Sequence, residues 1–212
     1  MTKSIFITGI DTDAGKSYAT GWLGNLLRGQ GKTVRTQKFI QTGNVGRSED
    51  IELHRRIMGD PIDGEDWSVS APVILSYPAS ADLAARIDGK PVDMAVIDRA
   101  REANEAVADV VLIEGAGGLM VPVNDSVLAI DYVESRGLDV ALVTNGKLGS
   151  INHTLLSLEA ISNRGLNLAY LIYNEHFDTD KVIAADTREY IRRHVAATFP
   201  SAQFLVVPTI NL

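Results

Sequence analysis

Short apolar runs alternate with longer segments of helical periodicity along the whole chain. Short apolar runs bounded by glycine and polar residues are typical of buried strands, whereas apolar residues at three- and four-residue spacing are typical of helices. The strands that this pattern predicts are Ile5–Thr8, Thr33–Gln37, Val110–Glu114, Val140–Thr144, Ala169–Asn174 and Phe204–Val207. The predicted helices lie near 16–28, 48–57, 92–107, 126–136, 151–164 and 181–196.

This alternation favours an α/β fold of three layers, in which a mostly parallel sheet carries helices on both faces. No linker rich in Pro, Gly or Ser divides the 212 residues, so we expect one domain, 1–212. In open parallel sheets, ligands bind beyond the carboxyl ends of the strands. Polar residues that directly follow a strand are therefore candidates for a functional site.

The composition excludes several kinds of protein. Without cysteine, the chain has no disulfides and no thiolate metal ligands, and its four histidines show no paired ligand spacing. Any metal is expected to be bound by oxygen, as Mg²⁺ is. A net charge of −7 argues against nucleic acid as a partner, and the basic stretches at 47–56 and 188–193 are expected to be solvated helix faces. No apolar run is long enough to span a membrane, so we expect a soluble, cytoplasmic protein with no membrane partner.

The strand at Ile5–Thr8 runs directly into Gly9-Ile-Asp-Thr-Asp-Ala-Gly-Lys-Ser17, the pattern of a phosphate-binding loop. Glycines let backbone N–H groups surround a phosphate, Lys16 can meet the β- and γ-phosphates, and the Ser17 hydroxyl can bind Mg²⁺. A helix beginning near Gly15 adds its positive end to the same anion. Five residues separate the two glycines where four are usual, so an ordinary strand-to-helix turn is the alternative. The apolar strand before the loop and the helix after it disfavour that alternative.

Glu114 ends another apolar strand and precedes four small residues at 115–118. A carboxylate in this position commonly completes the Mg²⁺ shell of nucleotide enzymes, and the glycines let a phosphate or substrate approach the backbone. The alternative is a tight turn after a core strand, with the carboxylate in solvent.

Lys38 follows a third strand at the same edge of the sheet, with Thr42 beyond it. A second lysine there can stabilise charge on a transferring phosphoryl group. A lone lysine after a strand is more commonly a surface residue, so both interpretations stay open. Asp50 opens the next predicted helix, and its position alone favours a helix-start carboxylate over a Mg²⁺ ligand.

Five motifs follow one another along the chain, namely Gly9-x-Asp-Thr-x-x-Gly-Lys-Ser17, Lys38-x-x-x-Thr-Gly43, Asp50, Glu114-Gly-Ala-Gly-Gly118 and Lys147-Leu-Gly-Ser-Ile-Asn-His153. Together they closely resemble the dethiobiotin synthetase family over residues 3 to 175, and the long loop spacing is that family's own. The resemblance implies a P-loop NTPase-like fold, a homodimer and an ATP-dependent ligase of biotin synthesis. Its substrates would be 7,8-diaminopelargonate, CO₂ or bicarbonate, and ATP with Mg²⁺.

The resemblance also implies roles, residue by residue. Catalytic roles fall to Lys16, Lys38 and Thr12. Nucleotide binding falls to Asp13, Ala14, Gly15, Lys16, Ser17, Glu114, Gly117, Asn174 and Glu175, and Mg²⁺ binding to Ser17, Asp50 and Glu114. Substrate binding falls to Thr42, Gly118, Ser150, Ile151 and Asn152, and the turn at 149–152 would meet the substrate carboxylate across the dimer interface.

The implied reaction needs no protein nucleophile. One substrate amine traps CO₂ as a carbamate, the γ-phosphoryl group of ATP is transferred to it, and the second amine closes the ring with loss of phosphate. His153 is accordingly expected to be a packed or helix-start residue rather than a general base. His54, His176 and His194 show no signal that separates them from surface histidines.

Three positions depart from the commonest pattern of the family, namely Ile10, Asp13 and Phe39. They leave open a related P-loop ligase that acts on another amine or carboxylate. A dimeric P-loop ATPase that switches conformation is a further alternative. Such switches usually carry a second lysine inside the phosphate loop, and residues 10–14 contain none.

Overall fold

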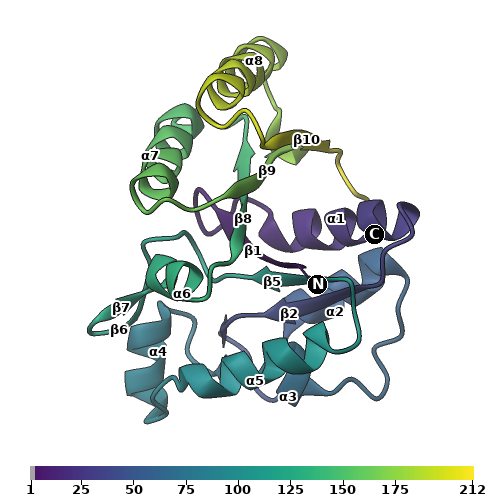
Figure 1. The fold of residues 1–212 in the computed structure, drawn as a ribbon, viewed down its shortest axis with the longest axis vertical. Coiled ribbons are helices and arrows are strands. Elements are labelled where there is room, and N and C mark those ends of the chain that lie inside the picture. The colour runs from purple at the N-terminus through teal and green to yellow at the C-terminus, as the bar shows by residue number, and fades with distance from the viewer. Residues whose placement is uncertain (1–2) are drawn as a thin grey trace.

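The computed structural model describes residues 3–212, and its central element is a six-stranded parallel sheet (Figure 1). The strands are ordered β10-β9-β8-β1-β5-β2 across the sheet. Their bounds are β1 Lys3–Gly9, β2 Val34–Lys38, β5 Val110–Glu114, β8 Asp139–Asn145, β9 Leu168–Asn174 and β10 Gln203–Val207. All six predicted strands and the parallel arrangement are thus confirmed.

The predicted helices are present as α1 Lys16–Gly29, α2 Glu49–Met58, α5 Met94–Glu105, α6 Ala129–Ser135, α7 Ser150–Asn163 and α8 Lys181–Thr198. The sequence pattern missed only short elements. These are the helices α3 Trp67–Ser70 and α4 Ala81–Asp88, the 3₁₀ turn η1 Glu175–Phe177, the strand pair β3 Gln41–Thr42 and β4 Ile74–Leu75, and the hairpin of β6 Pro122–Asn124 and β7 Val127–Leu128.

The helix predicted at 126–136 was placed too early, because α6 begins only at Ala129. The side chain of Asn124 accepts hydrogen bonds from the backbone N–H groups of Ser126 and Val127, which closes the β6–β7 turn. Such a side-chain-to-backbone turn competes with helix formation. The helix then starts where the Asp131 carboxylate accepts the N–H of Leu128 at 2.7 Å.

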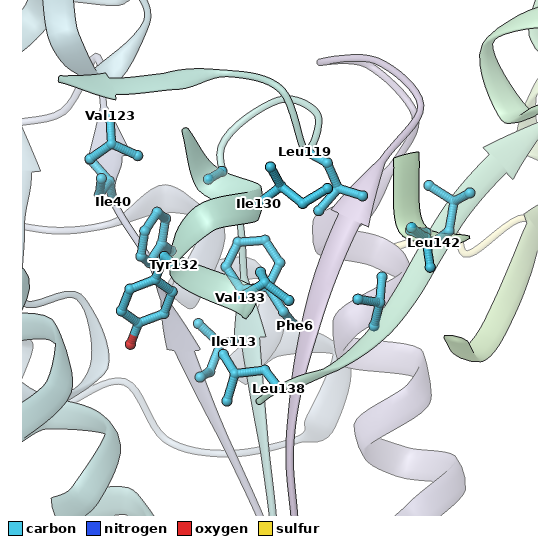
Figure 2. Close-up of a cluster of buried hydrophobic side chains, with 14 of the residues drawn as sticks. Phe6, Ile40, Ile113, Leu119, Val123, Ile130, Tyr132, Val133, Leu138 and Leu142 are labelled. Carbon is cyan, nitrogen blue, oxygen red and sulfur yellow. The ribbon is translucent and has the colours of Figure 1, made fainter. Parts of the chain in front are cut away.

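Alternate residues of each central strand feed two separate apolar cores, as expected for strands buried on both faces. In β1, Ile5 and Ile7 pack with α1 on one face, whereas Phe6 points to the core formed with α4 to α8 on the other. Figure 2 shows part of this second core, in which the aromatic rings of Phe6 and Tyr132 lie among aliphatic side chains. The sheet is therefore the middle of three layers.

Helix α2 packs closely on α1 because glycines face it. A methyl group at Gly21 would lie 2.8 Å from Cβ of Ile57, and one at Gly24 would lie 2.8 Å from Cε of Met58. Both distances are too short for real carbon contacts. The glycines thus let the last turn of α2 pack closely against the middle of α1.

The stretch at 47–56 is not the solvated helix face that its charges predict. Ile51, His54 and Arg55 of α2 are buried, and the Arg55 guanidinium binds Glu65 and the hydroxyl of Thr36. The spacing i, i+3, i+4 gives α2 one buried face in spite of its charge. In residues 3–212, no helix combines the length and the apolar composition needed to cross a membrane.

Candidate active site

The loop between β1 and α1 has the backbone of a phosphate-binding loop. Gly15 has φ of 86°, and a methyl group there would lie 2.0 Å from Nδ2 of Asn174, so only glycine fits. Helix α1 begins at Lys16, and no side chain caps its first turn. Because the first N–H groups of a helix have no partner within it, this end is suited to bind an anion.

Lys16 lies within this loop. Its Nζ donates to the backbone oxygens of Thr12 at 2.9 Å and Asp11 at 3.1 Å, and only 5% of the residue is exposed. Burial lowers the pKa of its ammonium below the usual value, although the Glu114 carboxylate opposes that effect. A phosphate in the loop would give this ammonium the anionic partner that it lacks at close range.

Four side chains from four elements meet beside the loop. The Ser17 hydroxyl lies 2.8 Å from Oδ1 of Asp50 and 2.9 Å from Oε1 of Glu114. Nζ of Lys38 lies 2.5 Å from Oδ2 of Asp50 and 2.8 Å from Oε1 of Glu114. The strand-end rule explains the meeting, because Lys38 and Glu114 are register partners on neighbouring parallel strands.

The opposite charges of Glu114 and Lys38 stabilise each other in this buried cluster. Burial alone would raise the pKa of the Glu114 carboxyl, but the Lys38 ammonium and the hydrogen bond from His54 hold it far below its usual range. Burial alone would lower the pKa of the Lys38 ammonium, but Glu114 and Asp50 raise it above the usual value. Glu114 is therefore ionised and Lys38 protonated, and neither is the solvated turn residue or surface lysine that was the alternative.

His54 was not predicted as a site residue, yet it is fully buried beside Glu114. Its Nε2 lies 2.6 Å from Oε2 of Glu114. The expectation of an ordinary surface histidine is wrong, because residue 54 falls on the buried face of α2 with Ile51 and Met58. That apolar spacing was the sequence signal that could have found it.

A cavity of about 670 Å³ opens over this cluster and the loop. It is lined by most of the predicted site residues, namely Thr12, Asp13, Gly15, Lys16, Ser17, Lys38, Thr42, Asp50, Glu114, Gly117 and Asn174. Its wall also holds Lys147, which opens the last of the five motifs, and residues to which the sequence analysis gave no role, namely His176, Phe177, Pro208 and Ile210. Most of these follow β8, β9 or β10, so the strand-end rule could have found them.

The remaining predicted residues lie outside the cavity wall. Ala14 is buried beneath the loop, and Gly118 lies against it, since a methyl group at Gly118 would be 3.2 Å from the oxygen of Gly9. Glu175 forms an ion pair with Arg188 at 2.6 Å. Their assignments to nucleotide and substrate stay predictions.

The turn at 149–152 is also outside the cavity of the single chain. Ser150, Ile151 and Asn152 open α7, whose cap Gly149 has φ of 93°. The buried Oγ of Ser150 has no hydrogen-bond partner among residues 3–212. Their predicted contact with a neighbouring subunit's substrate is likewise untested.

Comparison with known proteins decides the family. The model of a family described as "AAA domain" matches residues 3–209. The chain is 42% identical to the ATP-dependent dethiobiotin synthetase BioD 2 of Pasteurella multocida over the full length of both. It is 41% identical to that of Haemophilus ducreyi over 98% of this chain and 99% of the relative, and 42% identical to the BioD of Chlorobaculum tepidum over 97% and 85%. The chain belongs to the dethiobiotin synthetase family.

Solved structures of more distant proteins share the fold. The chain aligns with FtsY of Thermotoga maritima with a TM-score of 0.55 and 15% identity, over all of this chain and 63% of that one. It aligns with chloroplast FtsY of Physcomitrella patens with a TM-score of 0.54 and 19% identity, over 96% and 57%. These likenesses concern the fold alone, and they agree with the predicted P-loop NTPase-like class.

The three positions that depart from the commonest dethiobiotin synthetase pattern, Ile10, Asp13 and Phe39, lie in different surroundings. Phe39 is 1% exposed and packs against the rings of Phe6 and Tyr132, with centroids 5.3 and 4.7 Å away. It does not line the cavity, so its substitution concerns the core. Ile10 packs against both apolar cores, whereas Asp13 faces the cavity. Only Asp13 of the three is therefore placed to contact a ligand.

The donor atoms fit Mg²⁺ in the manner usual for nucleotide enzymes. Ser17, Asp50 and Glu114 offer one hydroxyl and two carboxylates, and this hard oxygen set suits Mg²⁺. Across residues 3–212, no group of three or more His, Cys, Asp or Glu side chains could hold a metal ion. Magnesium at this site would therefore also depend on phosphate oxygens, as Mg²⁺ commonly does.

Proposed function

We propose that this chain closes 7,8-diaminopelargonate with CO₂ to dethiobiotin, with conversion of ATP to ADP and phosphate. The observation that carries the proposal is a single cavity that contains both lysines and the oxygen cluster. Lys16 approaches it from the phosphate loop, and Lys38 approaches it from the end of β2. Two ammonium groups facing one space suit a reaction between two anions, here ATP and a carbamate.

The phosphate loop would hold the nucleotide. The free N–H groups at the start of α1 and the Lys16 ammonium would bind the β- and γ-phosphates, and Gly15 would let them approach the backbone. Thr12, Asp13, Ala14 and Gly117 would complete the surroundings of the phosphates. Asn174 and Glu175 would lie toward the base, next to the cavity wall at 176–177.

Ser17, Asp50 and Glu114 would hold Mg²⁺. The ion would neutralise phosphate charge and so ease the approach of a second anion. The protein prepares this site by holding the three oxygen-bearing side chains together and by keeping Glu114 ionised.

The chemistry would proceed in three steps. A substrate amine adds to CO₂ and loses a proton, which gives a carbamate. A carbamate oxygen attacks the γ-phosphorus, ADP departs, and a carbamic-phosphoric anhydride forms. The second amine then attacks the carbonyl carbon, loses a proton, and expels phosphate to close the ring. Lys38 would stabilise charge on the transferring phosphoryl group and the carbamate, since Glu114 and Asp50 raise its pKa and favour the ammonium form.

The substrate would lie between Thr42 and Gly118 at one end and the turn at 149–152 of a neighbouring subunit at the other. That turn combines the positive end of a helix of fourteen residues with the unpaired hydroxyl of Ser150. Both features suit the distal carboxylate of the diamine. A homodimer would therefore be required for a complete substrate site.

The direct test is an assay of ADP release with ATP, Mg²⁺ and bicarbonate, with and without 7,8-diaminopelargonate. Dethiobiotin is followed by mass in the same samples. We expect ADP release that depends on the diamine and matches dethiobiotin one to one. Release that ignores the diamine, or no release, would leave a P-loop enzyme with another substrate.

A further inference from the structure

We propose that His54 is a positioning residue that fixes the orientation of the Glu114 carboxylate toward the Mg²⁺ and phosphate side of the cavity; this role rests on the proposed function. None of the sequence motifs includes His54, and it does not line the cavity. Its action would therefore pass through Glu114.

The two oxygens of Glu114 have separate partners. Oε1 faces the Ser17 hydroxyl at 2.9 Å and the Lys38 ammonium at 2.8 Å, and both of these residues line the cavity. Oε2 faces away and is bound by Nε2 of His54 at 2.6 Å. Among residues 3–212, His54 is the one hydrogen-bond partner of Oε2, so it holds the second oxygen while Ser17 and Lys38 hold the first.

Helix α2 places Asp50 and His54 on opposite sides of this carboxylate. The two residues are four apart, so they lie one turn apart on the same helix face. Asp50 reaches Ser17 and Lys38, and His54 reaches the rear oxygen. The close packing of Ile57 and Met58 on the glycines of α1 holds the end of the same helix.

Only one of the two ring nitrogens of His54 is hydrogen-bonded, which packing alone does not explain. A carboxylate only accepts hydrogen bonds, so Nε2 carries the proton that binds Glu114. Nδ1 is buried and has no partner among residues 3–212. A buried unpaired nitrogen costs stability that a leucine of similar size would avoid. The benefit that offsets this cost is the bond to Oε2.

The test compares His54→Leu with His54→Gln. Leucine keeps the bulk and removes the donor, whereas glutamine keeps an N–H that can reach Oε2. Mn²⁺ binding in the presence of ADP, followed by EPR, reports on the site without turnover. We expect His54→Leu to weaken Mn²⁺ binding about 10- to 100-fold, to raise the half-saturating Mg²⁺ concentration, and to lower kcat more than it changes KM for the diamine. His54→Gln should restore most of each.

His194→Leu is the matched control, because α8 contributes no residue to the cavity. Wild-type Mn²⁺ affinity and kcat in folded His54→Leu would overturn the proposal, as would equal losses in the Leu and Gln variants. If His54→Leu does not fold, His54→Gln is compared with His54→Asn, whose amide falls short of Oε2, and equal Mn²⁺ affinity in that pair overturns it. If the wild type makes no dethiobiotin but the Mn²⁺ results hold, only the proposed function fails.

Discussion

Lys38 and Glu114 face each other across neighbouring strands, with Nζ 2.8 Å from Oε1, although both side chains are buried. The same ammonium lies 2.5 Å from Asp50, so one cation joins the two carboxylates proposed for Mg²⁺. Removal of that cation would leave two carboxylates close together in a poorly solvated place. The relationship links the stability of the fold to the chemistry proposed for the site.

We expect Lys38→Met to be both inactive and destabilised. Loss of one partner of a buried ion pair costs about 3–5 kcal/mol. Denaturant unfolding with and without Mg²⁺ and ADP measures the loss, and the ligands should recover part of it because Mg²⁺ replaces the missing cation. Unfolding free energy equal to the wild type would show that the pair contributes nothing net.

The same variant should weaken the pH dependence of stability in acid. In the wild type, Glu114 has a lowered pKa, so its contribution is complete above the ordinary value of 4.5 and is lost as pH falls below it. Lys38 has a raised pKa, so its contribution is complete below 10.5 and is lost only above that value. Without Lys38, one cause of the lowered Glu114 pKa is gone, so the stability of Lys38→Met should fall less steeply than that of the wild type as pH drops below 4.5, which thermal unfolding across this range measures.

Lys16→Gln should separate chemistry from stability. Its ammonium binds only loop carbonyls at close range and has a lowered pKa, so replacement should leave the melting temperature unchanged or higher. Turnover should fall about 10²- to 10³-fold, because one charge that faces the transferring phosphoryl group is lost. Steady-state kinetics and thermal unfolding on one preparation test both parts. Turnover near the wild-type rate would remove Lys16 from the mechanism.

Asp50→Asn should raise the Mg²⁺ concentration needed for half-maximal rate. Asp50 is half-buried against Ser17, whereas the neighbouring Glu49 is exposed and does not line the cavity. Glu49→Gln therefore removes the same charge one residue away and should leave the requirement unchanged. If both variants need the same Mg²⁺ as the wild type, Asp50 returns to the helix-start role that its position suggests.

A shared site at the dimer interface predicts complementation between two inactive variants. Lys16→Gln disables the phosphate side of a site, and Asn152→Ala disables the turn offered to the neighbour. In a mixed dimer both defects fall in one site and the other is intact, so random exchange should restore about a quarter of wild-type activity. The mixture is assayed after subunit exchange, with each variant alone as control. No recovery despite proven exchange would place each site within one subunit.

The elements that the sequence predicts well are those with a strong local pattern. The phosphate loop follows from contiguous residues, and the meeting of Lys38 with Glu114 follows from two strand ends at one edge. The β3–β4 pair and the β6–β7 hairpin are too short to show a period. His54 was missed because charged neighbours hide the buried face of α2, and its partner is 60 residues away in sequence.

The family resemblance suggests roles for residues of the site, whereas the geometry shows which side chains surround each of them. Position alone favours a helix-start role for Asp50, whereas the resemblance implies a metal ligand, and the distance to Ser17 is consistent with the second role. For Phe39 the geometry adds what the pattern could not, since the ring belongs to the core. Residues at an interface between subunits, such as Asn152, cannot be placed from one chain.

The most direct measurement follows oxygen from ¹⁸O-labelled bicarbonate during a single rapid turnover with ATP, Mg²⁺ and the diamine. If the γ-phosphoryl group is transferred to a carbamate in this cavity, one labelled oxygen leaves with phosphate and one remains in the ring carbonyl of dethiobiotin. Labelled phosphate in equal amount to dethiobiotin is the predicted result. Dethiobiotin formed with unlabelled phosphate would contradict phosphoryl transfer to the carbamate.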